Sequence, residues 1–252
     1  MPWRVFAASA TGPSHREDGR PCQDAFAHRT DGDNLIAVVC DGAGSCEQSH
    51  VGARVVSESV VHAIATQIEQ SLIRSDSSPE QWKKVVETVI SSAREALQAV
   101  AKAADGAVSA YASTLVGAVA WPSRLFFFHV GDGYAVARPR APDTTDIVSL
   151  PENGEYVNET YFVTGSEWQQ HLRMACHDVP IETVVLMSDG AAPFAMAKGQ
   201  QELHRPFIDP VLRYLDQTSE AEGTAALART LEDPRTDSIT TDDKTLLIAR
   251  WR

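Results

Sequence analysis

The stretch that decides the fold is Leu35-Ile-Ala-Val-Val-Cys-Asp41-Gly42-Ala-Gly44-Ser45. Its apolar run has the length of a β-strand and stops at an aspartate that glycines follow. A buried strand would therefore carry the Asp41 carboxylate to its end. The neighbouring Gly42 would let the backbone turn sharply and approach whatever the carboxylate binds.

The same pattern occurs elsewhere in the chain. Val184-Val-Leu-Met-Ser-Asp189-Gly190 repeats it closely, and Leu125-Phe-Phe-Phe-His-Val-Gly131-Asp132-Gly133 repeats it more loosely. Another acidic site, Asp242-Asp243, precedes the apolar run Lys244–Arg250. A single Asp-Gly is most often an ordinary turn, because both residues are common turn formers. Several of them after apolar strands indicate one shared metal site lined by carboxylate oxygens.

The composition is that of a globular protein with a proper core. The 252 residues are 43% hydrophobic, which is enough for one large domain or two small ones. Without a convincing boundary or internal repeat, we expect a single domain over residues 1–252. A net charge of -12 argues against a nonspecific nucleic-acid or membrane-surface binder, so we expect neither as a partner.

The lack of a recognisable targeting signal and the pattern of cysteines lead us to expect a cytoplasmic protein. No apolar run approaches the roughly 18 residues that a membrane span needs, and the N-terminus lacks the apolar region of a signal peptide. The four cysteines show no CxxC spacing, so reduced thiols are expected rather than a disulfide framework. Cys40, Cys46 and His50 could be imagined as zinc ligands, but they lack a fourth partner.

Residues 22–41 have the pattern of a hairpin. Asp24 begins an extended segment, Asp31-Gly32 gives a turn signal, and the strand that ends before Asp41 follows. Strands joined by a short turn are antiparallel, so the beginning of one lies beside the end of the other. The turn alone therefore predicts that Asp24 and Asp41 are neighbours.

Two amphipathic helices are expected after this hairpin. Ser45, with Gln48 three residues later, has the pattern of a capping box and predicts a helix that continues to about Leu72. Ser78-Pro79 predicts the start of a second helix, which Asp105-Gly106 ends. Each helix carries one apolar stripe, and such a stripe needs a sheet to cover.

The rest of the chain predicts an α+β fold with antiparallel sheets between helical layers. Short links between three consecutive strands indicate a meander. These strands are expected at Ala112–Ala120, Arg124–Val130 and Tyr134–Arg138. Helices are expected at Pro206–Leu215 and Glu220–Leu231. Residues 164–178 are polar, and they allow no assignment beyond a short helix around Trp168.

The acidic strand ends need positive charge if they meet. Carboxylates a few Å apart raise one another's pKa, and no lysine or arginine lies beside Asp41 or Asp189 in the sequence. Ligands that are all oxygen suit magnesium or manganese, and they suit zinc or copper poorly. The sequence therefore predicts a site for one of the harder divalent ions.

Other phosphate and hydrolase motifs are absent. The sequence has no GxxxxGK[ST] loop, no GxSxG and no HExxH. Asp41 lacks the second aspartate, two residues on, of an aspartyl-phosphate enzyme, and no cysteine is followed by arginine six positions later. Asp31 does not begin a calcium-hand loop. The remaining hypothesis is a site that binds metal and uses it to activate water.

Taken in order, these motifs resemble the metal-dependent type-2C protein serine/threonine phosphatases. The segments that carry the resemblance are Cys22-Gln23-Asp24, Val39-Cys40-Asp41-Gly42-Ala-Gly44, Ser113-Thr114, Gly131-Asp132-Gly133, Ser188-Asp189-Gly190 and Asp242-Asp243-Lys244-Thr245. It implies a four-layer α-β-β-α sandwich of two antiparallel sheets flanked by helix pairs. It also implies a flap around residues 151–181 and two or three magnesium or manganese ions.

The resemblance also implies a role for each site residue. Asp41 would bridge two metals, with the Gly42 carbonyl on one of them. Asp189 and Asp242 would hold the other metal, although a shift of one residue would replace Asp242 by Asp243. Asp24 would be a direct or water-mediated ligand, and Asp132 resembles the aspartate of a third metal. A metal-bridging hydroxide would attack phosphorus without a covalent enzyme intermediate.

The sequence departs from the family pattern at several positions, and two of these departures concern the binding of phosphate and the transfer of a proton. Members often have an arginine shortly before the first aspartate to bind phosphate; here the candidates are His15, Arg16 and Arg20, of which the loop pattern favours His15. Ala43 stands where some members have a histidine. The implied protein is a monomeric phosphatase that acts on a phosphoprotein, a serine/threonine kinase or the targets of one. The alternative is a catalytically weak or inactive regulatory relative that binds a phosphoprotein.

Overall fold

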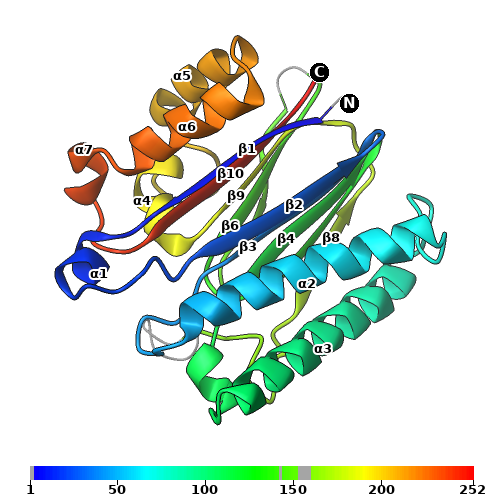
Figure 1. The fold of residues 1–252 in the computed structure, drawn as a ribbon. Helices are drawn as coiled ribbons and strands as arrows, with labels where there is room; N and C mark the ends of the chain where they lie inside the picture. The colour runs from blue at the N-terminus through cyan, green and yellow to red at the C-terminus, as the bar shows by residue number, and fades with distance from the viewer. Residues whose placement is uncertain (1–2, 142–143, 153–159) are drawn as a thin grey trace.

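The computed structural model describes residues 3–141, 144–152 and 160–252. Two five-stranded sheets pack face to face, with α2 and α3 outside one sheet and α5 and α6 outside the other (Figure 1). Every neighbouring pair of strands is antiparallel. This arrangement confirms the predicted four-layer sandwich. None of the helices in the described part of the chain is long and apolar enough to cross a bilayer.

The chain passes from one sheet to the other several times. In spatial order the first sheet contains β1 (Trp3–Ala10), β10 (Lys244–Trp251), β9 (Ile181–Met187), β6 (Tyr134–Pro139) and β7 (Ile147–Ser149). The second contains β2 (Ala25–Asp31), β3 (Asn34–Cys40), β4 (Leu115–Trp121), β5 (Arg124–Val130) and β8 (Arg173–His177). The helices are α1 (Pro13–Glu17), α2 (Ser49–Glu69), α3 (Pro79–Ala103), α4 (Ala192–Ala195), α5 (Arg205–Asp216), α6 (Glu220–Leu231) and α7 (Pro234–Asp237), with short 3-10 turns η1 (Val108–Tyr111) and η2 (Asp189–Ala191).

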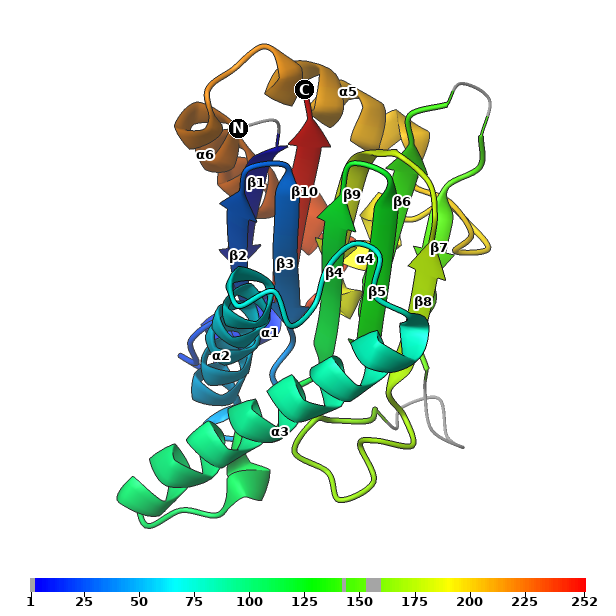
Figure 2. The same cartoon turned by 90° about the vertical axis from the view of Figure 1, so that its right-hand side faces the viewer.

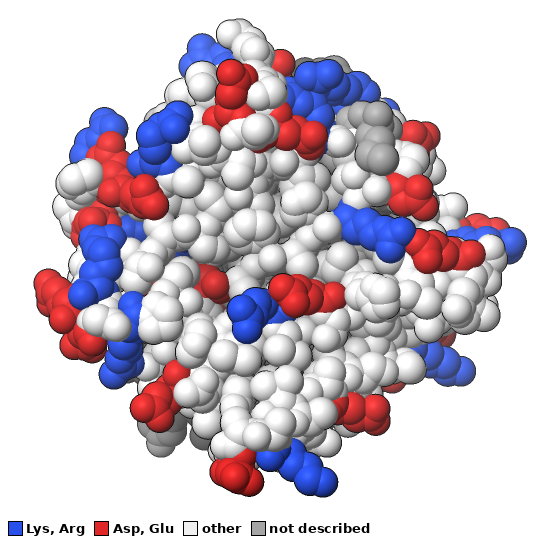
Figure 3. Space-filling model, in the orientation of Figure 1, with Lys and Arg blue, Asp and Glu red and all other residues white. Residues whose placement is uncertain are grey.

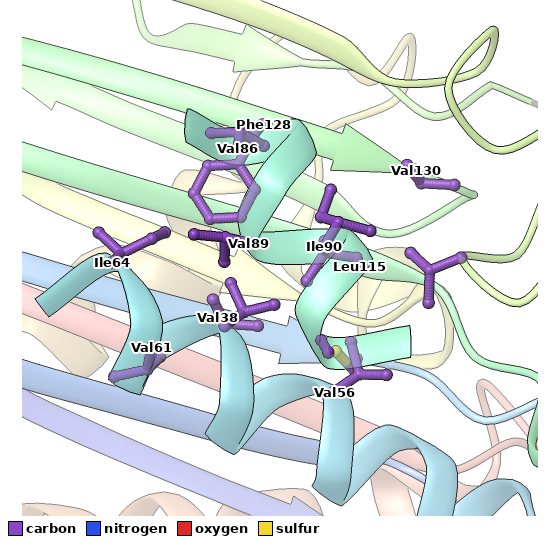
Figure 4. Close-up of a cluster of buried hydrophobic side chains, with 14 of the residues drawn as sticks. Val38, Val56, Val61, Ile64, Val86, Val89, Ile90, Leu115, Phe128 and Val130 are labelled. Carbon is purple, nitrogen blue, oxygen red and sulfur yellow. The ribbon is translucent and has the colours of Figure 1, made fainter. Parts of the chain in front are cut away.

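The unbroken apolar run of β3 follows from burial on both of its faces. Leu35 and Val39 point into the core between the sheets, whereas Val38 and Cys40 point into the core under α2 and α3. Figure 4 shows Val38 among side chains of both helices. Because a strand alternates its side chains, a strand between two apolar layers has no polar position.

The helix starts show which local signals decide the structure. Ser78 caps α3 with the expected capping box, in which its side chain accepts a hydrogen bond from the Gln81 amide. Helix α2, however, begins at Ser49 and not at Ser45. The backbone before α2 is bound to a distant segment, since the Ala43 amide donates a hydrogen bond to the Ala112 carbonyl at 2.9 Å. A tertiary contact therefore overrides the local capping pattern.

The predicted meander is wrong at its second link. Strands β4 and β5 pair as expected, but β6 leaves that sheet and pairs with β9 and β7 of the other one. Gly131 makes the crossing possible because its φ of 109° is a conformation that favours glycine. Strand β8, which pairs with β5, was not predicted, and the described residues around Trp168 form turns and not a helix (Figure 2).

Acidic and basic side chains are mixed on one face of the molecule (Figure 3). Figure 3 shows them interspersed on one face, where uncharged surface separates the lysines and arginines. Acidic and basic residues therefore lie close to one another on this face. Local clusters of one sign are for that reason more informative than the net charge.

Candidate metal centre

The acidic strand ends meet because the strands end at the same edge of the sandwich. In the registers, Ala10 pairs with Lys244, Leu246 with Met187, and Met187 with Tyr134. In the other sheet Ala25 pairs with Cys40, which places Asp24 beside Asp41 as the hairpin predicted. This edge lies near α1, at the opposite end from the two chain termini (Figure 1).

Three carboxylates form the centre of the site. Oxygens of Asp41, Asp132 and Asp189 all lie within 4.8 Å of one another. Together with Asp242 and Gly42, they line a cleft of about 300 Å³. Residues that lay far apart in the sequence are therefore gathered in one place, and no lysine or arginine is among the described residues that line the cleft.

Asp24 lies behind this cleft and is buried. The Ser188 hydroxyl donates a 2.7 Å hydrogen bond to its Oδ2. The same serine oxygen accepts a hydrogen bond from the Thr245 amide at 3.0 Å. Ser188 therefore ties the Asp24 carboxylate to the strand ends that flank Asp189 and Asp242.

Burial and mutual repulsion make these carboxylates costly to ionise in the metal-free protein. Burial is the main cause that raises the pKa of Asp189 to about 6 and that of Asp24 to about 7. The pKa of Asp41 is also raised well above its ordinary value, by burial first and then by the charges of Asp24 and Asp189. Burial raises the pKa of Asp242 too.

The residues present fit a hard divalent cation. Asp24 Oδ1, Asp132 Oδ1 and Asp189 Oδ1 are buried, and none of them has a hydrogen-bond partner among the described residues. Buried polar oxygens are normally paired, so three orphans beside one cleft require an explanation. A cation with oxygen ligands would satisfy them and offset the repulsion that raises the pKa values.

Gly190 allows two of the acidic segments to pack together. A Cβ atom at this position would lie 2.0 Å from the Asp243 carbonyl oxygen, which no side chain permits. The turn that carries Asp189 therefore touches the backbone just before β10. This contact brings Asp189 and Asp242 to the same cleft.

Asp242 and Asp243 point in different directions. Asp242 lines the cleft, whereas Asp243 is buried and binds the N-terminal segment. Its Oδ1 accepts from the Gly12 amide at 2.7 Å, and its Oδ2 accepts from the Gln23 amide at 2.5 Å and from His15 Nδ1 at 2.9 Å. The geometry therefore favours Asp242 over Asp243 as the residue that faces an ion.

The three candidates for binding phosphate have different surroundings. His15 is buried against Asp243, and its Nε2 is the nearest atom, at 3.9 Å, to the position of a Cβ on Gly44, a residue that lines the cleft. Arg16 pairs with Asp237, and Arg20 donates to the Gly44 carbonyl at 2.7 Å. His15 and Arg20 therefore both lie beside Gly44 at the edge of the cleft, and His15 is the buried one.

Several residues around the cleft have no predicted role in the site. Thr114 accepts a hydrogen bond from the Asp41 amide at 2.9 Å, and Thr160 donates one to Asp132 Oδ2 at 2.5 Å. Phe162 also lines the cleft, and Lys198 lines a cavity that adjoins it. Only Thr114 had a sequence signal, as part of Ser113-Thr114. The others come from loops whose path depends on tertiary packing.

Comparison with known proteins gives a consistent answer over most of the chain. A family model described as protein phosphatase 2C matches residues 11–232. Serine/threonine-protein phosphatase 3 of Escherichia coli (strain K12) is 27% identical over 259 aligned positions, which cover 100% of this chain and 99% of that protein. The match to the family model ends before Asp242, whereas the similarity to this relative includes it.

Solved structures share the fold at low sequence identity. A bacterial serine phosphatase superposes with a TM-score of 0.63 at 15% identity, covering 98% of this chain and 97% of the other. The structure of RsbX in complex with magnesium superposes with a TM-score of 0.59 at 14% identity, covering 99% of this chain and 96% of the other. Serine/threonine phosphatase Stp1 from Staphylococcus aureus superposes with a TM-score of 0.60 at 14% identity, covering 98% of this chain and 94% of the other.

Proposed function

The chain belongs to the protein phosphatase 2C family and is a metal-dependent protein serine/threonine phosphatase, and we propose that its acidic cleft is the catalytic centre. The observation that carries this assignment is the cluster of three carboxylates within 4.8 Å. An acidic cleft without a lysine or arginine among its described lining residues would repel a phosphate monoester unless cations were bound there. Metal binding and phosphate binding are therefore coupled in this site.

Each acidic residue has a role in the proposal. Asp41, the Gly42 carbonyl, Asp189 and Asp242 would hold two ions, and Asp132 would hold a third. The ions would be magnesium or manganese, because all the ligand atoms are oxygens. Bound ions of this kind lower the pKa of water and withdraw charge from phosphoryl oxygens.

Asp24 would act from behind the cleft. Its Oδ1 has no hydrogen-bond partner among the described residues, and its Oδ2 accepts from Ser188. A carboxylate in this position would bind an ion directly or orient water beside one. Because burial raises its pKa to about 7, Asp24 can also hold a proton near neutral pH when no ion is bound.

His15 would bind the phosphoryl group of the substrate. An ionised Asp243 only accepts hydrogen bonds, so the proton on this imidazole lies on Nδ1, which is 2.9 Å from Asp243 Oδ2. Nε2 then remains on the side of Gly44 and the cleft. With a second proton on Nε2, the ring would donate a charge-assisted hydrogen bond to a phosphoryl oxygen.

The wider setting of the proposed enzyme rests on the chain as a whole. We place one catalytic domain over residues 1–252, with a flap around residues 151–181 that contributes to substrate choice; residues 153–159 of it lie outside the described residues. Its four cysteines, all free thiols, suit the cytoplasm. The substrate would be a phosphorylated protein, a serine/threonine kinase or the targets of one, and the enzyme would act as a monomer.

Phosphate release from a phosphothreonine peptide tests this function. We expect hydrolysis with manganese or magnesium, and none after treatment with a chelator. Asp41→Asn and Asp189→Asn should each lower kcat at least about 100-fold, since each removes a proposed ligand. Asp216→Asn is the matched control, because Asp216 pairs with Arg250 at the surface.

Two results would contradict the assignment. Full hydrolysis in chelator would show that no divalent ion is needed, and full activity of either ligand variant would show that the cleft is not the centre. Binding of a phosphopeptide without any turnover would instead support the regulatory alternative, which the sequence allows because Ala43 replaces a histidine found in some members.

A further inference from the structure

A second cavity adjoins the acidic cleft. It has a volume of about 390 Å³ and shares Asp132 and Asp189 with the cleft. Tyr134, the first residue of β6, forms part of its wall. The segment after α4, which includes Lys198 and Gln200, forms another part. A substrate bound at the cleft would have its neighbouring residues within reach of this cavity.

The segment that carries Lys198 is a tight loop held by its own backbone. Met196 and Leu203 form an isolated antiparallel bridge, and the Ala197 amide donates to the Glu202 carbonyl at 2.9 Å. Gly199 and Gln200 both have positive φ, 93° and 58°. A non-glycine residue in this conformation is costly and persists only where its surroundings hold it. The loop therefore presents Lys198 in a fixed backbone setting.

Lys198 is the one lysine or arginine among the described residues that line either cavity. It forms no ion pair or side-chain hydrogen bond with any residue in the described ranges. Asp132 and Asp189 line the same cavity, yet neither lies within ion-pair distance of its ammonium.

The neighbouring polar groups also favour an anion. Tyr134 and Gln200 line the same cavity as Lys198. A neutral phenol and a side-chain amide can both donate hydrogen bonds. With the carboxylates occupied by cations, the remaining wall offers the donors of Tyr134, Gln200 and Lys198.

We propose, on the basis of the proposed phosphatase function, that Lys198 binds a second anionic group of the phosphoprotein, close in sequence to the phosphorylated serine or threonine. The chemistry is that of anionic oxygens, supplied either by an aspartate or glutamate side chain or by another phosphate. The enzyme thus prefers phosphosites in acidic or multiply phosphorylated segments. Lys198 is a specificity residue and takes no part in bond cleavage.

Matched phosphothreonine peptides test this proposal. One set carries a single glutamate at successive positions on either side of the phosphothreonine, a second carries lysine, a third carries a second phosphate, and a neutral peptide is the reference. The measured quantity is kcat/KM for each peptide divided by that for the neutral peptide. At low salt we expect the wild type to prefer the best acidic position about 2- to 5-fold, through KM and not kcat.

Three variants and one control establish the residue. Lys198→Ala should bring the ratio to about 1, Lys198→Glu should reverse it in favour of the lysine peptides, and Lys198→Arg should restore it. Lys84→Ala removes an exposed lysine of α3 and should keep the wild-type ratio. Salt at about 0.5 M should reduce the preference, because it screens exposed charges. A larger effect of the second phosphate than of glutamate would identify phosphate as the preferred source.

The outcomes separate this proposal from the proposed function. Equal ratios in the wild type, Lys198→Ala and Lys198→Glu would overturn the role of Lys198, even though the neutral peptide is hydrolysed. Fluorescence anisotropy of the labelled peptides gives the same ratio from binding alone. A protein that discriminates in binding but hydrolyses nothing would support the subsite and contradict the catalytic assignment.

Discussion

Removing one charge from the acidic cluster should stabilise the metal-free protein and weaken the metal-bound one. The perturbation is Asp189→Asn, which keeps the size of the side chain. In the metal-free protein burial and Asp132 raise the pKa of Asp189 to about 6, from an ordinary value of 3.8. Above pH 6 the protein therefore folds with a carboxylate that its surroundings disfavour.

The magnitude follows from the shift. The rise in the pKa of Asp189 from 3.8 to about 6 corresponds to about 3 kcal/mol of unfavourable ionisation at pH 8. Between about pH 4 and 6 the folded state binds more protons at this site than the unfolded state, so its free energy of unfolding falls as pH rises through that window. Asparagine removes this cost but loses part of the hydrogen bonding, so we expect a gain of roughly 5 °C in Tm at pH 8 in chelator.

Thermal unfolding followed by circular dichroism, with chelator and with manganese, measures the effect. Manganese should raise the Tm of the wild type, because a ligand that binds only the folded state stabilises it. Manganese should raise the Tm of Asp189→Asn much less, so that the variant has the higher Tm in chelator and the wild type has the higher Tm in manganese. Asp216→Asn should change Tm little in either condition, since the Asp216 side chain is 47% exposed and Arg250 keeps its ion pair with Glu182. A loss of Tm for Asp189→Asn in chelator as large as its loss in manganese would refute the reasoning.

Three further perturbations test the packing around the cleft. Gly190→Ala should destabilise the protein by about 2 kcal/mol or more, because its Cβ would meet a carbonyl oxygen at 2.0 Å, whereas Gly106→Ala, with its nearest atom at 3.6 Å, should be tolerated in the same urea titration. Ser188→Ala should lower the free energy of unfolding by about 2 kcal/mol in that assay, since the Asp24 carboxylate and the Thr245 backbone amide each lose a hydrogen-bond partner. An unchanged urea midpoint would count against a stabilising role for these two hydrogen bonds. Asp237→Ala should lower the free energy of unfolding by about 3 kcal/mol, because it leaves the buried Lys244 ammonium unpaired. Adding Lys244→Met should recover most of this loss. A double variant as unstable as Asp237→Ala would argue against charge as the cause.

The sequence contains much of this fold because the strands are unusually apolar. The run before Asp41 can be read as a strand buried on both faces, and the capping box at Ser78 as a helix start, without any tertiary information. Asp24 and Asp41 could be placed side by side because a tight turn fixes the register of a hairpin. Signals of this kind depend only on neighbouring residues, and so they can be recognised in a single sequence.

The remaining features depend on contacts between distant segments. Nothing near Gly131 states that β6 joins the other sheet, since a short link suits a hairpin as well as a crossing. The capping pattern at Ser45 fails because the backbone there pairs with residues 110–112. Strand β8 is short and half-buried, and its sequence Arg173-Met-Ala-Cys-His177 shows no alternation of apolar and polar residues that would mark a strand. Lys198 gave no signal at all, because its position depends on how one loop packs beside Asp132 and Asp189.

The most direct test of the account is a crystal structure of the protein soaked with manganese, with the ions located by their anomalous scattering. We expect at least two ions in the cleft, with oxygens of Asp41, Asp189 and Asp242 within bonding distance and Asp132 next to any third. An empty cleft at saturating manganese, or ions bound only elsewhere on the surface, would contradict the claim that these acidic strand ends form one metal centre.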